Sequence, residues 1–123
     1  MISVTLTYGK NGVLKNCKAN GHADFSKKGF DIVCSAVTVL LRTAAQLLSH
    51  MENVTFMADA SSRGQLFFEI CPKIDILGDT KESLETKVRL KCIADFIQNG
   101  ICSIQDEYPE NVRLKLVTLA VDD

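Results

Sequence analysis

Two residues that could do nucleophilic chemistry, Cys34 and His22, lie twelve positions apart. A thiolate attacks carbonyl carbon, and an imidazole can take the thiol proton, so the pair fits thiol acyl transfer. They lie at either end of a connection of about ten residues, where a few would suffice. Long loops in small domains are often functional. Gly21 and Gly29 flank this connection, and we expect them to make it a mobile loop.

A helix start is expected next to Cys34. Asp31 is a good N-cap residue, because its carboxylate can accept hydrogen bonds from backbone N–H groups of the first turn. That cap would place Cys34 at the third helical position, where the helix dipole and an adjacent imidazolium lower a thiol pKa. Asp31 could also orient His22, and the sequence does not decide between the two roles.

The other cysteines show no chemical pattern. The five cysteines form no CxxC motif, and the two histidines add no usual metal-ligand spacing, so we expect no metal and no organic cofactor. We interpret the remaining thiols as packing residues: Cys17, Cys71, Cys92 and Cys102. Free thiols and the lack of a recognisable signal peptide favour a cytoplasmic protein.

The elements that must position these residues follow from the hydropathy pattern. Alternating apolar and polar residues predict strands over 2–8, 13–20, 54–59, 65–71 and 112–116. Helices are predicted over 32–50 and 80–103. The order ββαββαβ predicts an α+β fold, with a mixed, mainly antiparallel five-stranded sheet packed with two helices. The length predicts one domain over residues 1–123.

The second helix has three expected details. Asp79 and Glu82 have the spacing of a capping box at its start. Gly100 is unfavourable in a helix by about 1 kcal/mol and marks a possible break or early end. The expected apolar face contains Leu84, Val88, Cys92, Phe96, Ile97, Ile101 and Ile104.

Charge and apolar surface restrict the partners. The formal net charge of −1 gives no strong attraction to nucleic acid or to anionic membranes. Polar residues interrupt the apolar run over 32–48, so we expect no membrane span. Residues 32–50 nevertheless form a helix that is apolar around most of its circumference. One sheet face cannot cover it, and we therefore expect a homodimer.

Two sequence blocks resemble the ribosomal-processing cysteine protease family, Prp. They are Gly21-His22-Ala23 and Gly29-Phe30-Asp31-Ile32-Val33-Cys34-Ser35-Ala36, and the spacing between them also fits. The start of the chain and Glu107-Tyr108-Pro109 add weaker support, and the resemblance covers essentially the whole chain. Ser35 departs from the family, where alanine is common, and Lys27-Lys28 makes the loop more basic than in many members.

The resemblance implies a cytoplasmic, homodimeric thiol protease that removes a short N-terminal extension from large-subunit ribosomal protein twenty-seven. It assigns the catalytic dyad to His22 and Cys34 and implies that the loop between them orders around substrate. The helix start adds candidate oxyanion donors, the backbone N–H groups of Cys34 and Ser35, each of which is typically worth about 10²–10³ in rate.

Two other functions are considered. A dimeric module could bind the ribosomal protein without cutting it, although the presence of both Cys34 and His22 argues against this. A redox-sensing protein would also use an exposed, acidic thiol, but it needs a resolving cysteine nearby. The nearest cysteine in sequence, Cys17, precedes the loop in a strand.

Overall fold

The computed structural model describes residues 1–21, 30–60 and 64–120. Its elements follow the predicted order ββαββαβ, so the α+β fold is confirmed. They are β1 (Ile2–Tyr8), β2 (Leu14–Asn20), α1 (Phe30–Ser49), β3 (Val54–Asp59), β4 (Gln65–Pro72), α2 (Lys81–Glu107) and β5 (Val112–Thr118).

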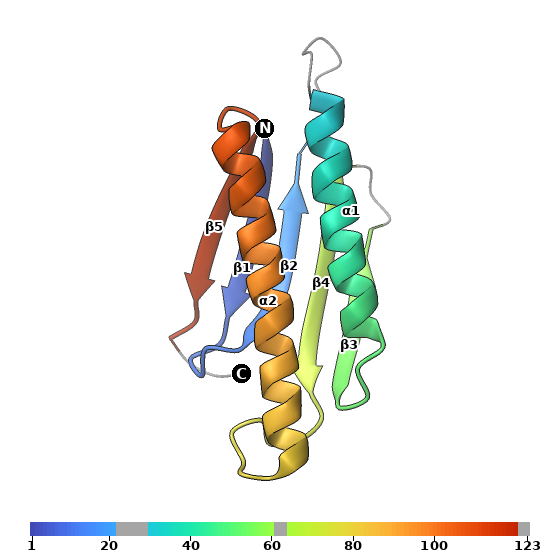
Figure 1. The fold of residues 1–123 in the computed structure, drawn as a ribbon, viewed down its shortest axis with the longest axis vertical. Coiled ribbons are helices and arrows are strands. Elements are labelled where there is room, and N and C mark those ends of the chain that lie inside the picture. The colour runs from blue at the N-terminus through green and yellow to red at the C-terminus, as the bar shows by residue number, and fades with distance from the viewer. Residues whose placement is uncertain (22–29, 61–63, 121–123) are drawn as a thin grey trace.

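The sheet is mixed and its five strands have the order β3-β4-β2-β1-β5. β1 pairs in parallel with β5, while the other three pairings are antiparallel. Both helices pack against one face of this sheet and run side by side, so the molecule has two layers (Figure 1). β2 ends and β4 begins at the same end of the sheet, because Asn20 is paired with Gln65.

The core lies between these two layers. Alternate residues of each strand face the helices: in β1 the side chains of Val4 and Leu6 are fully buried, while Ser3 is exposed. α1 contributes residues at helical spacing, including Val33, Val37 and Leu41. Buried residues recur at about every second position in the strands and every third or fourth position in the helices. The strand and helix predictions rest on this pattern.

The turn between β1 and β2 is built around Asn11 and Gly12. Gly12 has φ +82°, a left-handed conformation that glycine adopts without steric cost. Its N–H donates to the carbonyl of Gly9 at 2.9 Å, and the Asn11 side chain accepts from the Val13 N–H at 3.0 Å. These bonds close a tight connection between the two strands.

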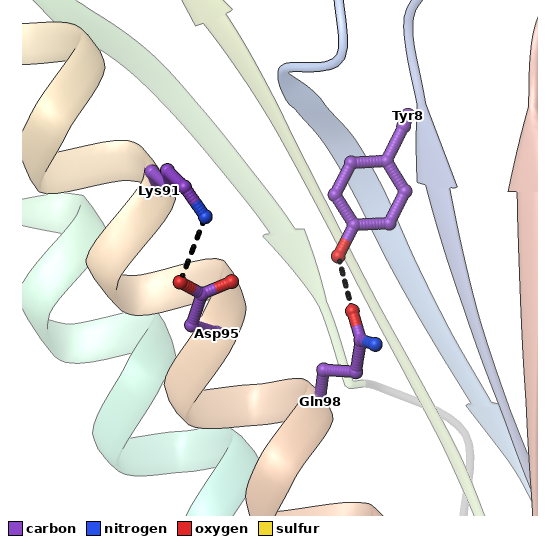
Figure 2. Close-up of polar contacts among 4 residues, drawn as sticks. All are labelled: Tyr8, Lys91, Asp95 and Gln98. Atoms are coloured by element: carbon purple, nitrogen blue, oxygen red, sulfur yellow. Dashed lines mark hydrogen bonds and ion pairs between the residues drawn. The ribbon is translucent and has the colours of Figure 1, made fainter.

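A polar contact ties α2 to the sheet. The Tyr8 hydroxyl donates to the side-chain carbonyl of Gln98 at 3.2 Å (Figure 2). Burial, with a smaller contribution from Asp95, raises the pKa of Tyr8, so the phenol stays a donor. Lys91 pairs with Asp95 at 3.0 Å beside it, but both side chains are exposed, and such pairs contribute little to stability.

The start and middle of α2 differ from the prediction. The N-cap is Thr80, whose hydroxyl accepts from the Ser83 N–H at 3.1 Å, so the capping box of Asp79 and Glu82 is wrong. The helix also continues through Gly100 to Glu107. At Gly100, an added Cβ would lie 2.1 Å from a methyl carbon of Leu40, so this glycine allows α1 and α2 to pack closely.

The expected apolar face of α2 is also wrong in part. Ile97 and Ile101 are buried, but Leu84, Val88 and Phe96 are 62%, 51% and 46% exposed. The face turned to the sheet carries smaller and more polar residues than expected; its buried members are Ser83, Thr86, Leu90, Ala94, Ile97 and Ile101. Large apolar side chains therefore remain on the outer surface of the helical layer.

The residues 32–49 of α1 are long and apolar enough for a membrane span, by length and composition alone. Here this segment packs on one face of the sheet through Val33, Val37, Leu41, Ala44 and Leu48, and 28% of its residues are buried. A core helix passes the same test as a membrane span, so the test is weak evidence for a membrane location.

Candidate active site

Cys34 lies in the first part of α1. This helix begins beside the end of β2 and the start of β4 (Figure 1). It is half-buried, and it packs at the edge of the core next to the fully buried Val33. The sulfur is therefore not enclosed by packed hydrocarbon, which a nucleophile must avoid.

The helix start differs from the expected one. α1 begins at Phe30, so Asp31 is its second residue and not the N-cap, and Cys34 is the fifth residue and not the third. In the helical pattern each N–H bonds to the carbonyl four residues earlier, which directs the N–H groups of Cys34 and Ser35 to Phe30 and Asp31. The proposed oxyanion donors are therefore engaged within the helix unless its first turn opens.

Cys34 lines a cavity of about 260 Å³ between α1 and the sheet. The cavity walls come from four parts of the chain: one flank of α1, the start of β1, the end of β2, and the start of β4 with the connection before it. The lining residues are Ile2, Ala19, Asn20, Gly21, Cys34, Val37, Thr38, Leu41, Arg42, Ala60, Gly64, Gln65 and Leu66. The Cys34 side chain thus lies at a partly apolar hollow, the arrangement expected of a binding site.

Gly21 lies on the wall of this cavity, at the end of β2. Its N–H donates to the Gly64 carbonyl at 2.9 Å, which joins the end of β2 to the start of β4. An added Cβ would lie 2.8 Å from Ile2 Cα, so Gly21 permits a close approach of two backbone segments. Its φ is not in the left-handed range, so the close approach explains glycine at this position, and the expected loop mobility remains a prediction.

Several expected site residues lie outside the described part of the chain. They are His22, Gly29 and the side chain of Asp31, and their predicted roles remain predictions. Gly21, the last described residue before His22 in the sequence, lines the cavity that Cys34 also lines.

The other cysteines have environments unlike that of Cys34. Cys17 is fully buried in the core, and burial raises the pKa of its thiol to about 12, so it stays protonated and unreactive. This confirms the packing role of Cys17. For Cys71 and Cys92 the packing interpretation is wrong, since both are exposed. Cys102 is half-buried in α2.

Within the described residues no group of three His, Cys, Asp or Glu side chains is placed to hold a metal ion. Part of the cavity was not predicted from the sequence. Thr38 and Arg42 follow Cys34 at spacings of four and eight residues, so one flank of α1 presents all three to the cavity. That spacing was a usable signal. Asn20 and Gln65 had none, because their meeting depends on β2 lying beside β4.

Comparison with solved structures shows the same fold in proteins of two bacteria. The SMU.848 protein of Streptococcus mutans is 27% identical, with a TM-score of 0.68 over 97% of this chain and 96% of that one. An essential ribosomal processing protease Prp from S. aureus, in complex with a substrate peptide, is 21% identical, with a TM-score of 0.69 over 94% of this chain and 99% of that one.

The same S. aureus protease with a covalently linked product peptide is 24% identical, with a TM-score of 0.65. No curated protein sequence matches the chain. The family model described as cysteine protease Prp matches residues 1–113, which is nearly the whole chain. With its half-buried thiol at the wall of a cavity, this chain belongs to the Prp family of cysteine proteases.

Proposed function

We propose that this cysteine protease removes the N-terminal extension of large-subunit ribosomal protein twenty-seven, with Cys34 as nucleophile and His22 as general base. Membership of the Prp family supports the substrate, as does the S. aureus relative, which is described as a ribosomal processing protease. The observation that carries the proposal is the half-buried Cys34 on the wall of a 260 Å³ cavity from which the chain continues to His22.

The proposed reaction has two stages. His22 takes the proton of Cys34, the thiolate attacks the scissile carbonyl carbon, and the C–N bond breaks as His22 returns the proton to the leaving amine. Water then attacks the thioester, which releases the cleaved extension as a carboxylic acid and restores the thiol. No metal or organic cofactor is required by these steps.

The oxyanion that forms in both stages needs N–H donors. Cys34 and Ser35 can supply them only after the first turn of α1 opens, because both N–H groups face carbonyls inside the helix. Substrate binding would then order the catalytic geometry, as the family resemblance implies. Asp31 either orients His22 or stabilises the helix start, and a comparison of Asp31→Asn with Asp31→Ala separates these roles.

The test is cleavage of a synthetic peptide that spans the extension of the ribosomal protein from the same genome. Cys34→Ala, Cys34→Ser and His22→Ala should each abolish cleavage as followed by mass spectrometry. Cys71→Ala, which changes an exposed cysteine outside the 260 Å³ cavity, should cleave normally. Normal turnover by His22→Ala would exclude the dyad, and binding of the peptide with unchanged mass would favour a non-catalytic binding module.

Thiol reactivity gives an independent test. Iodoacetamide should label Cys34 faster than the exposed Cys71 and Cys92 below pH 8, because an activated thiolate reacts where ordinary thiols do not. Equal labelling rates at these three cysteines would contradict an activated nucleophile. A diagonal gel after peroxide treatment tests the redox-sensor alternative, which requires a disulfide from Cys34 to a second cysteine.

We further propose that the protein is a cytoplasmic homodimer that associates through the outer surface of its helical layer. Only 28% of residues 32–49 are buried, and both helices expose large apolar side chains on this layer. They are Ile32, Val39 and Leu47 of α1 and Leu84, Val88 and Phe96 of α2. Several large exposed apolar side chains on one layer favour a protein interface there.

Light scattering after size exclusion should give twice the mass of one chain at micromolar concentration. Val39→Glu should convert this dimer to a monomer, because Val39 is 64% exposed on the outer surface of α1. Met57→Glu is the matched control, since Met57 is 58% exposed on the sheet and away from the helices. A clean monomer of the unmodified chain would refute the dimer. Cell fractionation tests the location.

A further inference from the structure

The face of the sheet opposite the helices carries a group of positive side chains. Both helices lie on one side of the sheet, so no described helix covers this open face (Figure 1). Lys18, Arg113 and Lys115 are exposed, and each is next in its strand to a residue that packs on the helical side. Because side chains alternate along a strand, all three point to the open face. The net charge of −1 therefore conceals a local positive surface.

The strand register brings these three side chains together. Thr5 of β1 is paired with Lys18 of β2 on one side and with Lys115 of β5 on the other. Strands lie about 4.8 Å apart, so the backbones at the two lysines are about 10 Å apart, with Thr5 between them. Arg113 is two residues before Lys115, about 7 Å away, and is paired with Ser3. These five residues form a surface that we call the basic patch.

The positive charge of the basic patch is not neutralised by the described part of the chain. None of its three cations forms an ion pair with a described residue. The acidic strand residues of the open face, Asp59 and Glu69, lie on β3 and β4, in the other half of the sheet. The basic patch therefore presents ammonium, guanidinium and hydroxyl groups, and it contains no large apolar side chain.

An aromatic side chain borders the basic patch. Phe67 of β4 is paired with Lys18, and it faces the open side because its neighbour Phe68 is fully buried. An aromatic ring beside cations on an open sheet is an arrangement on which single-stranded nucleic acid binds, with bases stacked on the ring and phosphates held by Lys and Arg. Protein interfaces, by contrast, have an apolar centre, which the basic patch lacks.

We propose that the open face of the sheet binds single-stranded RNA, with phosphates on Lys18, Arg113 and Lys115 and a base against Phe67. Each phosphate contact in a single strand contributes about 0.7 to the salt dependence, so three predict that log K falls with log salt at a slope of about −2. Binding should then weaken about 20-fold from 50 to 200 mM salt. This site is separate from the proteolytic site, since the basic patch lies across the sheet from α1, which carries Cys34.

Fluorescence anisotropy with a labelled single-stranded RNA of about ten nucleotides tests the proposal over a series of salt concentrations. Lys18→Gln, Arg113→Gln and Lys115→Gln should each make the slope shallower by about 0.7, and the three together should abolish binding. Phe67→Ala should weaken binding by about 5-fold or more and leave the slope unchanged, because stacking is not ionic. Arg89→Gln changes an exposed arginine of α2 on the helical layer and should bind RNA normally.

Four results would overturn the proposal. They are no binding at the lowest salt concentration, unchanged binding by a triple variant with native circular dichroism, unchanged affinity of Phe67→Ala, and equally tight binding of a poly-glutamate peptide. The last result would assign the basic patch to an acidic protein instead of RNA. Cys34→Ala should bind the RNA normally, and the triple variant should cleave the peptide substrate at the unmodified rate. RNA binding and the proposed proteolysis are therefore tested independently.

Discussion

Replacing Gly21 by Ala tests whether this glycine serves packing or loop mobility. The added Cβ would lie 2.8 Å from Ile2 Cα, 2.8 Å from Ile2 Cγ1 and 3.0 Å from the carbonyl oxygen of Met1. Two of these three atoms belong to the backbone, and Ile2 also begins the paired strand β1. No rotamer change can relieve the overlap, so the end of β2 or the start of β1 must move.

The magnitude follows from two opposing effects. Overpacking of this kind costs about 1–3 kcal/mol. Because φ of Gly21 is not positive, alanine can adopt the backbone conformation, and its stiffer unfolded chain returns about 0.4–1 kcal/mol. The free energy of unfolding should therefore fall by about 1–2 kcal/mol. If Gly21 were only a flexible hinge, the same substitution would raise it by about 0.4–1 kcal/mol.

Urea denaturation measures this sign directly. Gly12→Ala is the contrasting control: no atom lies within 4 Å of its added Cβ, but φ is +82°. That variant should lose about 1 kcal/mol through backbone strain alone, and Gly12→Asn should lose less. Gly21→Ala should also cleave peptide more slowly, since Gly21 lines the cavity. A Gly21→Ala protein as stable as the unmodified chain would refute the packing argument.

Three further substitutions test other features of the fold. Cys17 ionises only near pH 12 when folded but near 9 when unfolded, so its neutral form stabilises the fold below pH 9, and this stability is lost as pH rises toward 12. Between pH 9 and 11, the free energy of unfolding of the unmodified protein should therefore fall by about 1.4 kcal/mol per pH unit relative to that of Cys17→Ala. A difference between the two proteins that stays constant over this range would contradict the prediction. Thr80→Ala should cost about 1 kcal/mol by loss of the helix cap, whereas Asp79→Ala should change stability little, and the reverse order would restore the capping box. Gly100→Ala should destabilise the unmodified chain, and it should destabilise a Leu40→Ala variant much less. Additive effects in this double-mutant cycle would exclude the Leu40 contact.

The strands were predictable because one face of the sheet is covered by helices and the other is not. Each strand then alternates buried and exposed residues, and this local pattern does not depend on which strand is its neighbour. The predicted bounds of β1 and β3 agree with the structure, and β5 extends two residues past its prediction, to Thr118. The order β3-β4-β2-β1-β5 has no such local signal.

The orientation of α2 was not predictable from hydropathy, for a physical reason. The face against the sheet includes Ser83, Thr86 and Ala94, whose small side chains allow close packing. Larger apolar residues at the neighbouring spacing, Leu84 and Val88, form a stronger hydrophobic stripe that points outward. Hydropathy alone predicts that the outward stripe is the buried one. A stripe that packs in a protein interface has the same spacing of apolar residues as a stripe that packs in the core.

Cys34 and the cavity beside it also differ in how far the sequence predicts them. The block around Cys34 is continuous in sequence, so the residue could be singled out before any fold was known. The surface that faces Cys34 is assembled by sheet topology: β2 pairs with β4, which brings Asn20 beside Gln65 at the strand end where α1 begins. Arg42 lies on the helix, but the cavity that it lines also requires that second wall. The composition of the cavity therefore depends on the strand order, while the position of Cys34 depends on the local motif. Substitutions at Arg42 or Gln65 should accordingly alter which peptide is cut and leave the labelling rate of Cys34 unchanged.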